Sequence, residues 1–222
     1  MANIEIASFN TGSAIIAQEN GADRVELCAE MEVGGTTPAV EDVVEVRKVI
    51  TIDLNVMIRP RGGNFIYTDK EFEQMCRSIL VMKELGVDGL VFGILNADNS
   101  VNILQNQALV ELASPIPCTF HRAFDEVVDL SKSLEDVIAC GFTTILTSGC
   151  KPNVNEGLYN LRDLVKWANN RIVIMPGGGL RSTNIELVLR ETGASYFHSS
   201  AITDGSDTAV SAEVRALKAK LS

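Results

Sequence analysis

The sequence feature that most restricts the fold is a short apolar run followed by a helical segment, which recurs eight times. Strands are predicted at residues 4–7, 25–28, 54–58, 88–92, 117–120, 143–146, 171–175 and 195–198. Helical segments are predicted at residues 13–20, 38–50, 68–85, 101–112, 131–140, 158–168, 184–191 and 210–221. The repeating unit stays near ~25–30 residues, and no linker or low-complexity stretch interrupts it. The pattern predicts a single-domain (β/α)8 TIM barrel over residues 1–222.

The alternative fold is an open, doubly wound sheet. A dinucleotide-binding sheet carries its glycine-rich turn after the first strand. Here the glycine cluster, residues 177–179, follows the seventh strand. The barrel therefore fits the sequence better.

Composition narrows the class of partner. The 222 residues carry a formal net charge of −10, which argues against nucleic acid and anionic membranes as main partners. No apolar run approaches the ~18–20 residues of a membrane span, and no secretory signal is visible. The chain has five cysteines in no C-x-x-C spacing, so reduced thiols in the cytoplasm are expected. They are Cys28, Cys76, Cys118, Cys140 and Cys150.

Chemistry in such barrels takes place at the carboxyl ends of the strands. Two carboxylates, Glu5 and Glu26, lie on predicted strands, and Glu26 shares a strand face with Cys28. The only two histidines, His121 and His198, fall at equivalent places in their units. These four ionisable side chains, Glu5, Glu26, His121 and His198, are the candidate catalytic residues.

A second group of strand-end residues is suited to hold an anion. Gly177, Gly178 and Gly179 follow the seventh strand, where barrels often bind phosphate, although a tight turn with positive φ also explains them. Ser148 and Ser199 add hydroxyl groups.

Two arginines follow the third strand. Arg59 and Arg61 flank a proline and are candidates for a carboxylate or phosphate fork. An ion pair with Glu5 or Glu26 is the structural alternative, because buried carboxylates need partners.

These residues together suggest an enzyme that acts on a small anionic metabolite, with phosphorylated metabolites included. Glu5 or Glu26 would act as general base, and His121 or His198 as acid or oxyanion stabiliser. No predicted strand ends in lysine, so lyase or isomerase-like proton transfer is favoured over covalent catalysis. A third hypothesis is a barrel that acts mainly by binding partners, with a polar mouth that has no activity of its own.

Six segments, taken in order, resemble the CutC family of copper homeostasis proteins. They are residues 20–28, 34–38, 58–63, 119–125, 146–149 and 197–200, and the likeness spans essentially the whole chain. The resemblance implies a (β/α)8 barrel, a cytoplasmic location, a role in handling Cu(I) and a homo-oligomer.

The resemblance transfers only part of a metal site. In family members proposed to bind Cu(I), one cysteine ends the second strand, where this chain has Cys28, and another ends the first, where it has Ala7. Cu(I) favours two or three soft thiolate ligands. Cys150 would replace the missing one if the two loops meet, and His121 and His198 are further candidate ligands.

Overall fold

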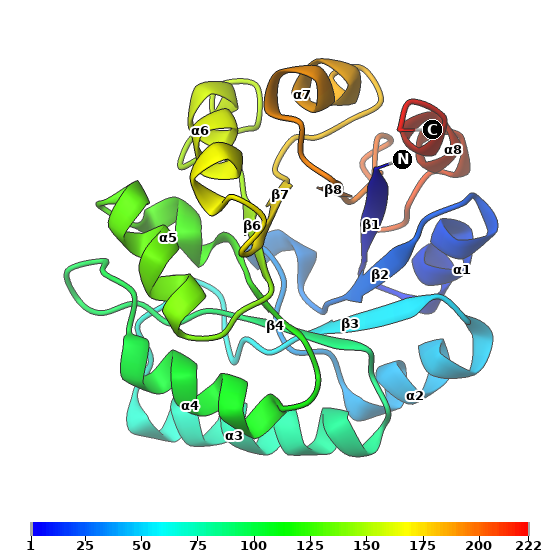
Figure 1. Ribbon diagram of the computed structural model, residues 1–222. Coiled ribbons are helices and arrows are strands. Elements are labelled where there is room, and N and C mark those ends of the chain that lie inside the picture. Colours follow the sequence, from blue (N-terminus) through cyan, green and yellow to red (C-terminus); the bar gives the residue numbers. More distant parts are fainter. Residues whose placement is uncertain (1, 222) are drawn as a thin grey trace.

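Figure 1 shows the computed structural model, which describes residues 2–221. Within these residues eight strands alternate with eight α-helices, as predicted. The strands are β1 (Asn3–Ser8), β2 (Arg24–Leu27), β3 (Asp53–Met57), β4 (Gly89–Phe92), β5 (Cys118–Phe120), β6 (Thr144–Thr147), β7 (Val173–Pro176) and β8 (Tyr196–Ser199). The helices are α1 (Thr11–Glu19), α2 (Val40–Val49), α3 (Asp69–Glu84), α4 (Ile103–Ala113), α5 (Leu130–Ala139), α6 (Leu158–Ala168), α7 (Ile185–Thr192) and α8 (Ser211–Ala219).

The strands pair in parallel in the order β7-β6-β5-β4-β3-β2-β1-β8. Strand β8 returns to pair with β1, with His198 opposite Glu5. Strands β7 and β8 are also in contact, so the sheet curls into a nearly closed barrel with the helices outside it (Figure 1). The prediction of a single (β/α)8 barrel is confirmed.

Alternation along each strand separates an apolar outer face from a mixed inner one. One large apolar cluster joins the outward strand residues, such as Ile4 and Val25, to the helices. A separate small cluster contains Cys28, Met57 and Val91. The inner face also carries polar side chains, which are described below.

Gly89 on the inner face of β4 shows how closely this interior is filled. A Cβ atom added there would lie 2.0 Å from Oδ1 of Asn55 on neighbouring β3. The glycine is therefore needed to make room for the buried amide, in line with the use of glycine where chains approach closely.

Two predicted helix starts had different outcomes. Thr68 begins α3 in a capping box, in which its hydroxyl accepts from the Glu71 N–H and the Glu71 carboxylate accepts from the Thr68 N–H. The predicted start near Pro38 is wrong, because α2 begins at Val40 after an N-cap residue, Ala39, whose side chain makes no cap bond. Thr37, two residues before this N-cap, accepts from the Arg59 N–H at 2.8 Å and so joins the loops after β2 and β3.

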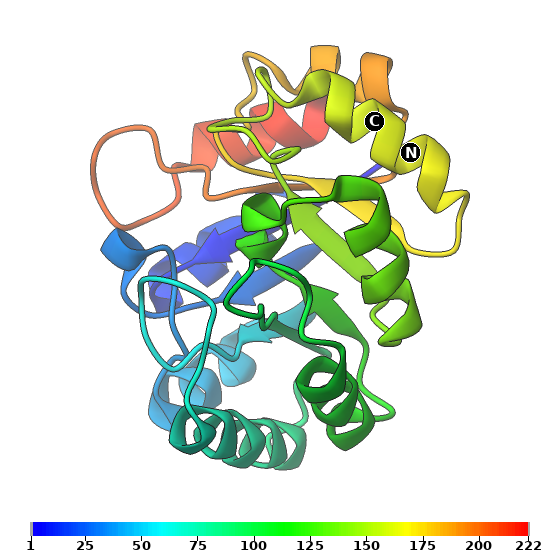
Figure 2. The same cartoon turned by 90° about the vertical axis from the view of Figure 1, so that its left-hand side faces the viewer.

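The loops at the carboxyl ends of the strands contain two short 3-10 helices, η1 (Met31–Val33) and η2 (Arg122–Glu126). In Figure 2 the cyan loop after β3 and the orange-red loop after β8 project from the same side of the barrel. This side carries the candidate site. Among residues 2–221, no helix combines the length and the apolar character that crossing a bilayer requires.

Candidate functional site

A cavity of about 370 Å³ opens at the carboxyl ends of the strands. Its wall includes residues from the ends of β1, β2, β3, β5, β7 and β8, among them Ala7, Glu26, Arg59, His121 and His198. A volume of this size suits a small molecule.

The floor of the site is a buried network around Glu5. The Glu5 side chain is fully buried, and its Oε1 lies 2.7 Å from His198 Nδ1. Its Oε2 accepts from Arg24 Nε at 2.5 Å. Burial alone would raise the pKa of Glu5, but the Arg24 guanidinium and the His198 hydrogen bond lower it to about 2. Glu5 is therefore a carboxylate, and Nδ1 of His198 is the donor.

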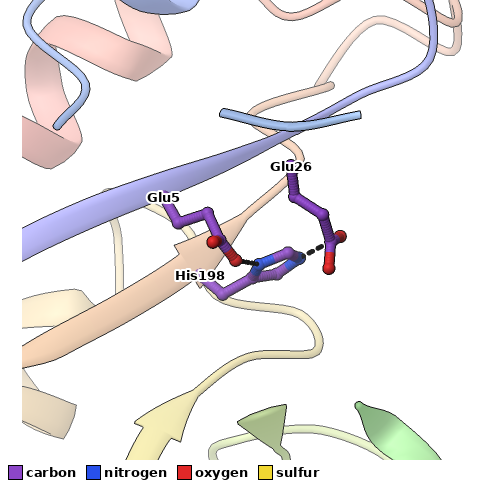
Figure 3. Close-up of side chains that lie close together, drawn as sticks. All are labelled: Glu5, Glu26 and His198. Atoms are coloured by element: carbon purple, nitrogen blue, oxygen red, sulfur yellow. Dashed lines mark hydrogen bonds and ion pairs between the residues drawn. The ribbon is translucent and has the colours of Figure 1, made fainter. Parts of the chain in front are cut away.

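Glu26 stands on the other side of the same imidazole (Figure 3). Its Oε2 lies 3.8 Å from His198 Nε2 and 3.5 Å from the Cys28 thiol that donates to it. Its Oε1 is buried and has no hydrogen-bond partner among the described residues. Burial raises the pKa of Glu26, the His198 charge lowers it and the nearby Glu5 charge raises it further. The resulting pKa is about 7.

Both carboxylates favour the protonated form of His198. Burial would lower the pKa of His198, but the charges of Glu26 and Glu5 and the hydrogen bond to Glu5 raise it. A proton at Nε2 thus faces a carboxylate whose own pKa is near neutral. Such a pair is suited to general acid–base chemistry at neutral pH.

His121 also borders the cavity and differs from His198 in its hydrogen bonds. Its Nδ1 accepts from the Ala123 N–H at 3.2 Å, so the proton of the neutral ring is on Nε2. Burial, together with the charge of Arg59, lowers the pKa of His121 to about 3. Nε2 is buried with no partner within residues 2–221. His121 is therefore a neutral hydrogen-bond donor rather than an acid.

Arg59 and Arg61 do not form a fork. Arg59 borders the cavity, but its Nη atoms donate to the carbonyl oxygens of Val33, Gly35 and Gly63. Arg61 is not in the cavity wall and pairs with Glu71 at 2.6 Å. The alternative of an ion pair with Glu5 or Glu26 is wrong, because among the described residues Glu5 pairs with Arg24 and His198, and Glu26 lies within ion-pair distance of His198 alone.

The glycine segment after β7 takes part in the cavity wall. Gly178 and Gly179 border the cavity with φ values of +100° and +69°. Gly177 lies behind them, and a Cβ there would come within 3.1 Å of His198 Cβ. The positive φ values agree with the expected tight turn, and anion binding by this segment stays a prediction.

Of the two serines predicted to bind an anion, one borders the cavity and the other does not. Ser199 borders the cavity and donates to Leu180 O at 2.7 Å. Ser148 is not in the cavity wall. Its hydroxyl bonds Asp125 at 3.0 Å and accepts from Arg122 at 3.1 Å, so it fixes the loop after β6.

The structure does not bring the two candidate metal cysteines into one cavity wall. Cys28 is buried in the cavity wall, and burial beside Glu26 raises the pKa of its thiol well above the usual value. Cys150 is outside this wall and donates to Phe124 O at 3.2 Å. Ala7 borders the cavity and supplies no ligand atom.

A second set of metal-ligating groups is Glu5, Glu26 and His198, whose ligand atoms lie within 4.8 Å of one another. The Arg24 guanidinium on Glu5 places a fixed positive charge against this set. Hydrogen bonds already engage Glu5 and Nδ1 of His198. The geometry therefore matches a proton-transfer network better than a cation site.

Two arginines of the site were missed from the sequence. Arg24 was identifiable, because it shares strand parity with Glu26 and so points the same way. Arg181 borders the cavity from the loop after β7. Loops have no periodicity that would have indicated its direction.

Comparisons with known proteins agree with this architecture. A model of the CutC family matches residues 2–203. The chain is similar to a Homo sapiens protein named copper homeostasis protein cutC homolog, with 43% identity over 198 residues, covering 89% of this chain and 72% of that protein. It is similar to a family protein CutC of Parabacteroides distasonis, with 44% identity over 199 residues, covering 89% of this chain and 82% of that one.

Solved structures give the same result. The crystal structure of a CutC protein from Streptococcus agalactiae covers 91% of this chain and 100% of its own, with a TM-score of 0.87 and 37% identity. A phosphoribosylanthranilate isomerase from Thermotoga maritima covers 100% of this chain and 98% of its own, with a TM-score of 0.67. At 13% identity the second likeness shows the fold alone.

Proposed function

The chain belongs to the CutC family, and from that premise we propose that its barrel mouth binds a small anionic molecule and moves a proton on it. The observation that carries the proposal is the position of the His198 ring between two buried carboxylates (Figure 3). A carboxylate with a pKa near 7 beside a histidine with a raised pKa is arranged for proton transfer.

Glu26 is the proton acceptor in this proposal. Its Oε1 is the unpaired oxygen, and its pKa of about 7 leaves a substantial carboxylate fraction at neutral pH. When it removes a proton from a carbon next to a carbonyl group, the C–H electron pair forms an enolate. The same proton, or one exchanged with solvent, then returns to carbon.

The other side chains hold the charges in place. Glu5 fixes the tautomer of His198, so that Nε2 faces Glu26. His121 offers Nε2–H as a neutral donor to the developing oxyanion. Arg59 supplies a positive charge to an anionic substrate.

The test is exchange of carbon-bound hydrogen with solvent deuterium, followed by proton NMR. The panel consists of small carbonyl compounds that carry phosphate or carboxylate groups, incubated with the wild-type chain and with Glu26→Gln. The control is Glu135→Gln, which alters a surface carboxylate bound to Arg171. We expect exchange on at least one compound with wild type and control, and its loss in Glu26→Gln. Absence of exchange across the panel would contradict the proposal.

Handling of Cu(I) is the second candidate, and the names of the relatives favour it. On the structural side, Cys28, Met31 and Met57 all border the cavity, and thiolate and thioether sulfur atoms suit Cu(I). Against it, Cys28 is the only cysteine among the described residues of the cavity wall, and its raised pKa disfavours the thiolate.

A Cu(I) competition titration on the reduced chain tests the second candidate. Cys28→Ser should abolish tight one-to-one binding, whereas Cys150→Ser should leave it unchanged, because Cys150 is outside the cavity wall. Weak binding that is equal in all three proteins would contradict a copper site. We further infer a cytoplasmic location, which is supported by the five free thiols.

A further inference from the structure

We propose that the ligand of this cavity is a bis-anion, with one anionic group held on the β3 side by Arg59 and the other on the β7 side by Arg181. The proposal rests on the proposed function for the identity of the site, but it concerns binding alone. It names the substrate class as a short molecule with two terminal charges, such as a phosphorylated carboxylic acid.

The charges around the cavity differ from those of the chain as a whole. The chain has a net charge of −10, yet three arginines border the cavity, and Glu26 is the only carboxylate-bearing residue among the described residues that line it. The three are Arg59, Arg122 and Arg181. A cleft lined by one sign of charge concentrates ligands of the other sign.

The three arginines are not equivalent. Arg122 is neutralised by Asp125 at 2.7 Å. Within residues 2–221, no carboxylate lies within ion-pair distance of Arg59 or Arg181. These two cavity arginines therefore hold uncompensated positive charges.

Arg59 is buried, and hydrogen bonds fix its position. It is 4% exposed, and carbonyl oxygens hold both of its Nη atoms. Its Nε is buried and has no acceptor among the described residues. A buried guanidinium paired only with neutral groups is costly, and an anion in the cavity offsets that cost.

Arg181 is held in the same manner at the other side. Its Nη1 donates to Leu180 O at 2.7 Å and to Ser199 Oγ at 3.2 Å. Its Nη2 donates to Ile202 O at 3.1 Å. All of these acceptors are neutral, so the charge remains available to a ligand.

The two arginines start from opposite sides of the mouth, and their guanidinium groups turn toward the loop after β2 and the carboxyl end of β8. Arg59 bonds Val33 O and Gly35 O, and Arg181 bonds Ser199 Oγ and Ile202 O. Arg59 follows β3 and Arg181 follows β7, and four strand steps separate these strands in an eight-stranded ring. Figure 1 shows β3 and β7 across the barrel from each other. Glu26 and His198, on β2 and β8, belong to strands between them on one side of that ring. A ligand that reaches both arginines therefore passes the proton-transfer pair with its middle part.

The β7 side has further donors that fit a phosphate group. Gly178, Gly179 and Ser200 border the cavity, and their backbone N–H groups have no acceptor among residues 2–221. Backbone N–H groups beside an arginine are a common arrangement for phosphate oxygens. We therefore assign the phosphate end to Arg181 and the carboxylate end to Arg59.

Isothermal titration with matched anions tests the two-ended ligand. The bis-anions, which carry an anionic group at each end, are 2-phosphoglycolate, 3-phosphoglycerate and succinate; the mono-anions, here meaning compounds with a single anionic group, are inorganic phosphate, glycerol 3-phosphate and glycolate. We expect at least one bis-anion to bind about tenfold or more tightly than either matching mono-anion. If no bis-anion exceeds its matching mono-anions, or no anion binds, the proposal is overturned.

Variants assign the two ends. Arg181→Gln should reduce the affinity for the bis-anion to that of glycolate, and Arg59→Lys, which keeps the charge, should weaken it less than Arg59→Gln. Arg162→Gln, which alters an exposed arginine on α6, is the control and should bind as wild type. Circular dichroism confirms folding of each variant. Unchanged bis-anion affinity in a folded Arg181→Gln variant would overturn the assignment.

The titration and the deuterium-exchange measurement together separate binding from chemistry. Tight bis-anion binding without deuterium exchange in the wild-type chain would leave the two-ended ligand standing and remove the proton-transfer function. Deuterium exchange on a mono-anion without any preference for bis-anions would do the reverse.

Discussion

His198 Nδ1 donates to Glu5 Oε1 at 2.7 Å, although the two residues are 193 positions apart in the chain. Closure of the barrel makes the contact, because β8 pairs with β1 and places His198 opposite Glu5. The bond directs the other imidazole nitrogen toward Glu26. The fold thus positions an acid–base pair through its first and last strands.

The ion pair between Arg24 and Glu5 should be important for stability. Arg24→Met removes the cation and leaves a buried carboxylate whose remaining hydrogen-bond donors are His198 and Asn55. Removal of one partner of a buried pair costs about 3–5 kcal/mol, so we expect a loss of that order in urea unfolding. The exposed pair of Arg171 and Glu135 is the control, and Arg171→Met should cost less than about 1 kcal/mol. Equal costs would contradict the network.

The pH dependence of stability should have a definite sign. Glu26 and His198 both have raised pKa values in the folded chain, so the folded state binds more protons than the unfolded one. Their contribution to stability is present at low pH and is lost as the pH rises toward and beyond 7. Glu26→Gln should flatten this fall in the free energy of unfolding, measured from pH 5 to pH 8. A fall of the same slope in that variant would show that Glu26 is not the titrating group.

Glu5 should act in the opposite direction at acid pH. Its pKa is lowered from 4.5 to about 2, so its contribution is present above pH 4.5 and is lost as the pH falls toward 2. Acid unfolding of Glu5→Gln should therefore depend less steeply on pH in this range than that of the wild type. A steeper dependence in the variant would exclude a depressed pKa at this residue.

Gly89 and Asn55 should be coupled in stability. Gly89→Ala places a Cβ 2.0 Å from Asn55 Oδ1, and such overpacking costs about 1–3 kcal/mol. Shortening the neighbour, in Asn55→Ala with Gly89→Ala, should recover part of that loss in a double-mutant cycle. Gly12→Ala near the start of α1 is the control and should cost less, since its nearest atom, Asn10 Oδ1, is 3.3 Å away and has to shift by only a few tenths of an ångström. Strict additivity of the two substitutions would contradict the contact.

The cysteines should differ in reactivity. Cys28 is buried and its pKa is raised well above the usual value, whereas Cys76 is only partly buried. Mass spectrometry after brief iodoacetamide treatment at pH 8 should find Cys76 modified and Cys28 unmodified. The same treatment in urea should modify both. Rapid modification of Cys28 in the folded chain would show an open thiolate, which would favour the copper candidate.

The sequence predicted the architecture because strand and helix periods are local properties. The eightfold alternation of apolar runs was sufficient for the barrel, and the alternation of residues 24, 26 and 28 was sufficient for an inward face. The resemblance to the CutC family is confirmed by the family model. The roles of individual arginines depend on tertiary partners and could not be predicted. Arg61 pairs with Glu71, whereas Arg59 is held by backbone carbonyls of two loops.

The same limit applies to the histidines. Their equivalent positions in the repeat predicted that both lie at the barrel mouth, and both border the cavity. Their opposite pKa shifts arise from neighbours on other strands. Carboxylates flank His198, whereas His121 is buried near Arg59.

Deuterium incorporation tests proton transfer at this barrel mouth most directly. It is measured for the wild-type chain, Glu26→Gln and Glu135→Gln on the same anionic carbonyl compounds. We expect incorporation by the wild type and by Glu135→Gln, and a loss of about a hundredfold or more in Glu26→Gln. Incorporation at the wild-type rate in Glu26→Gln, or none in any protein, would contradict a proton-transfer site at this barrel mouth.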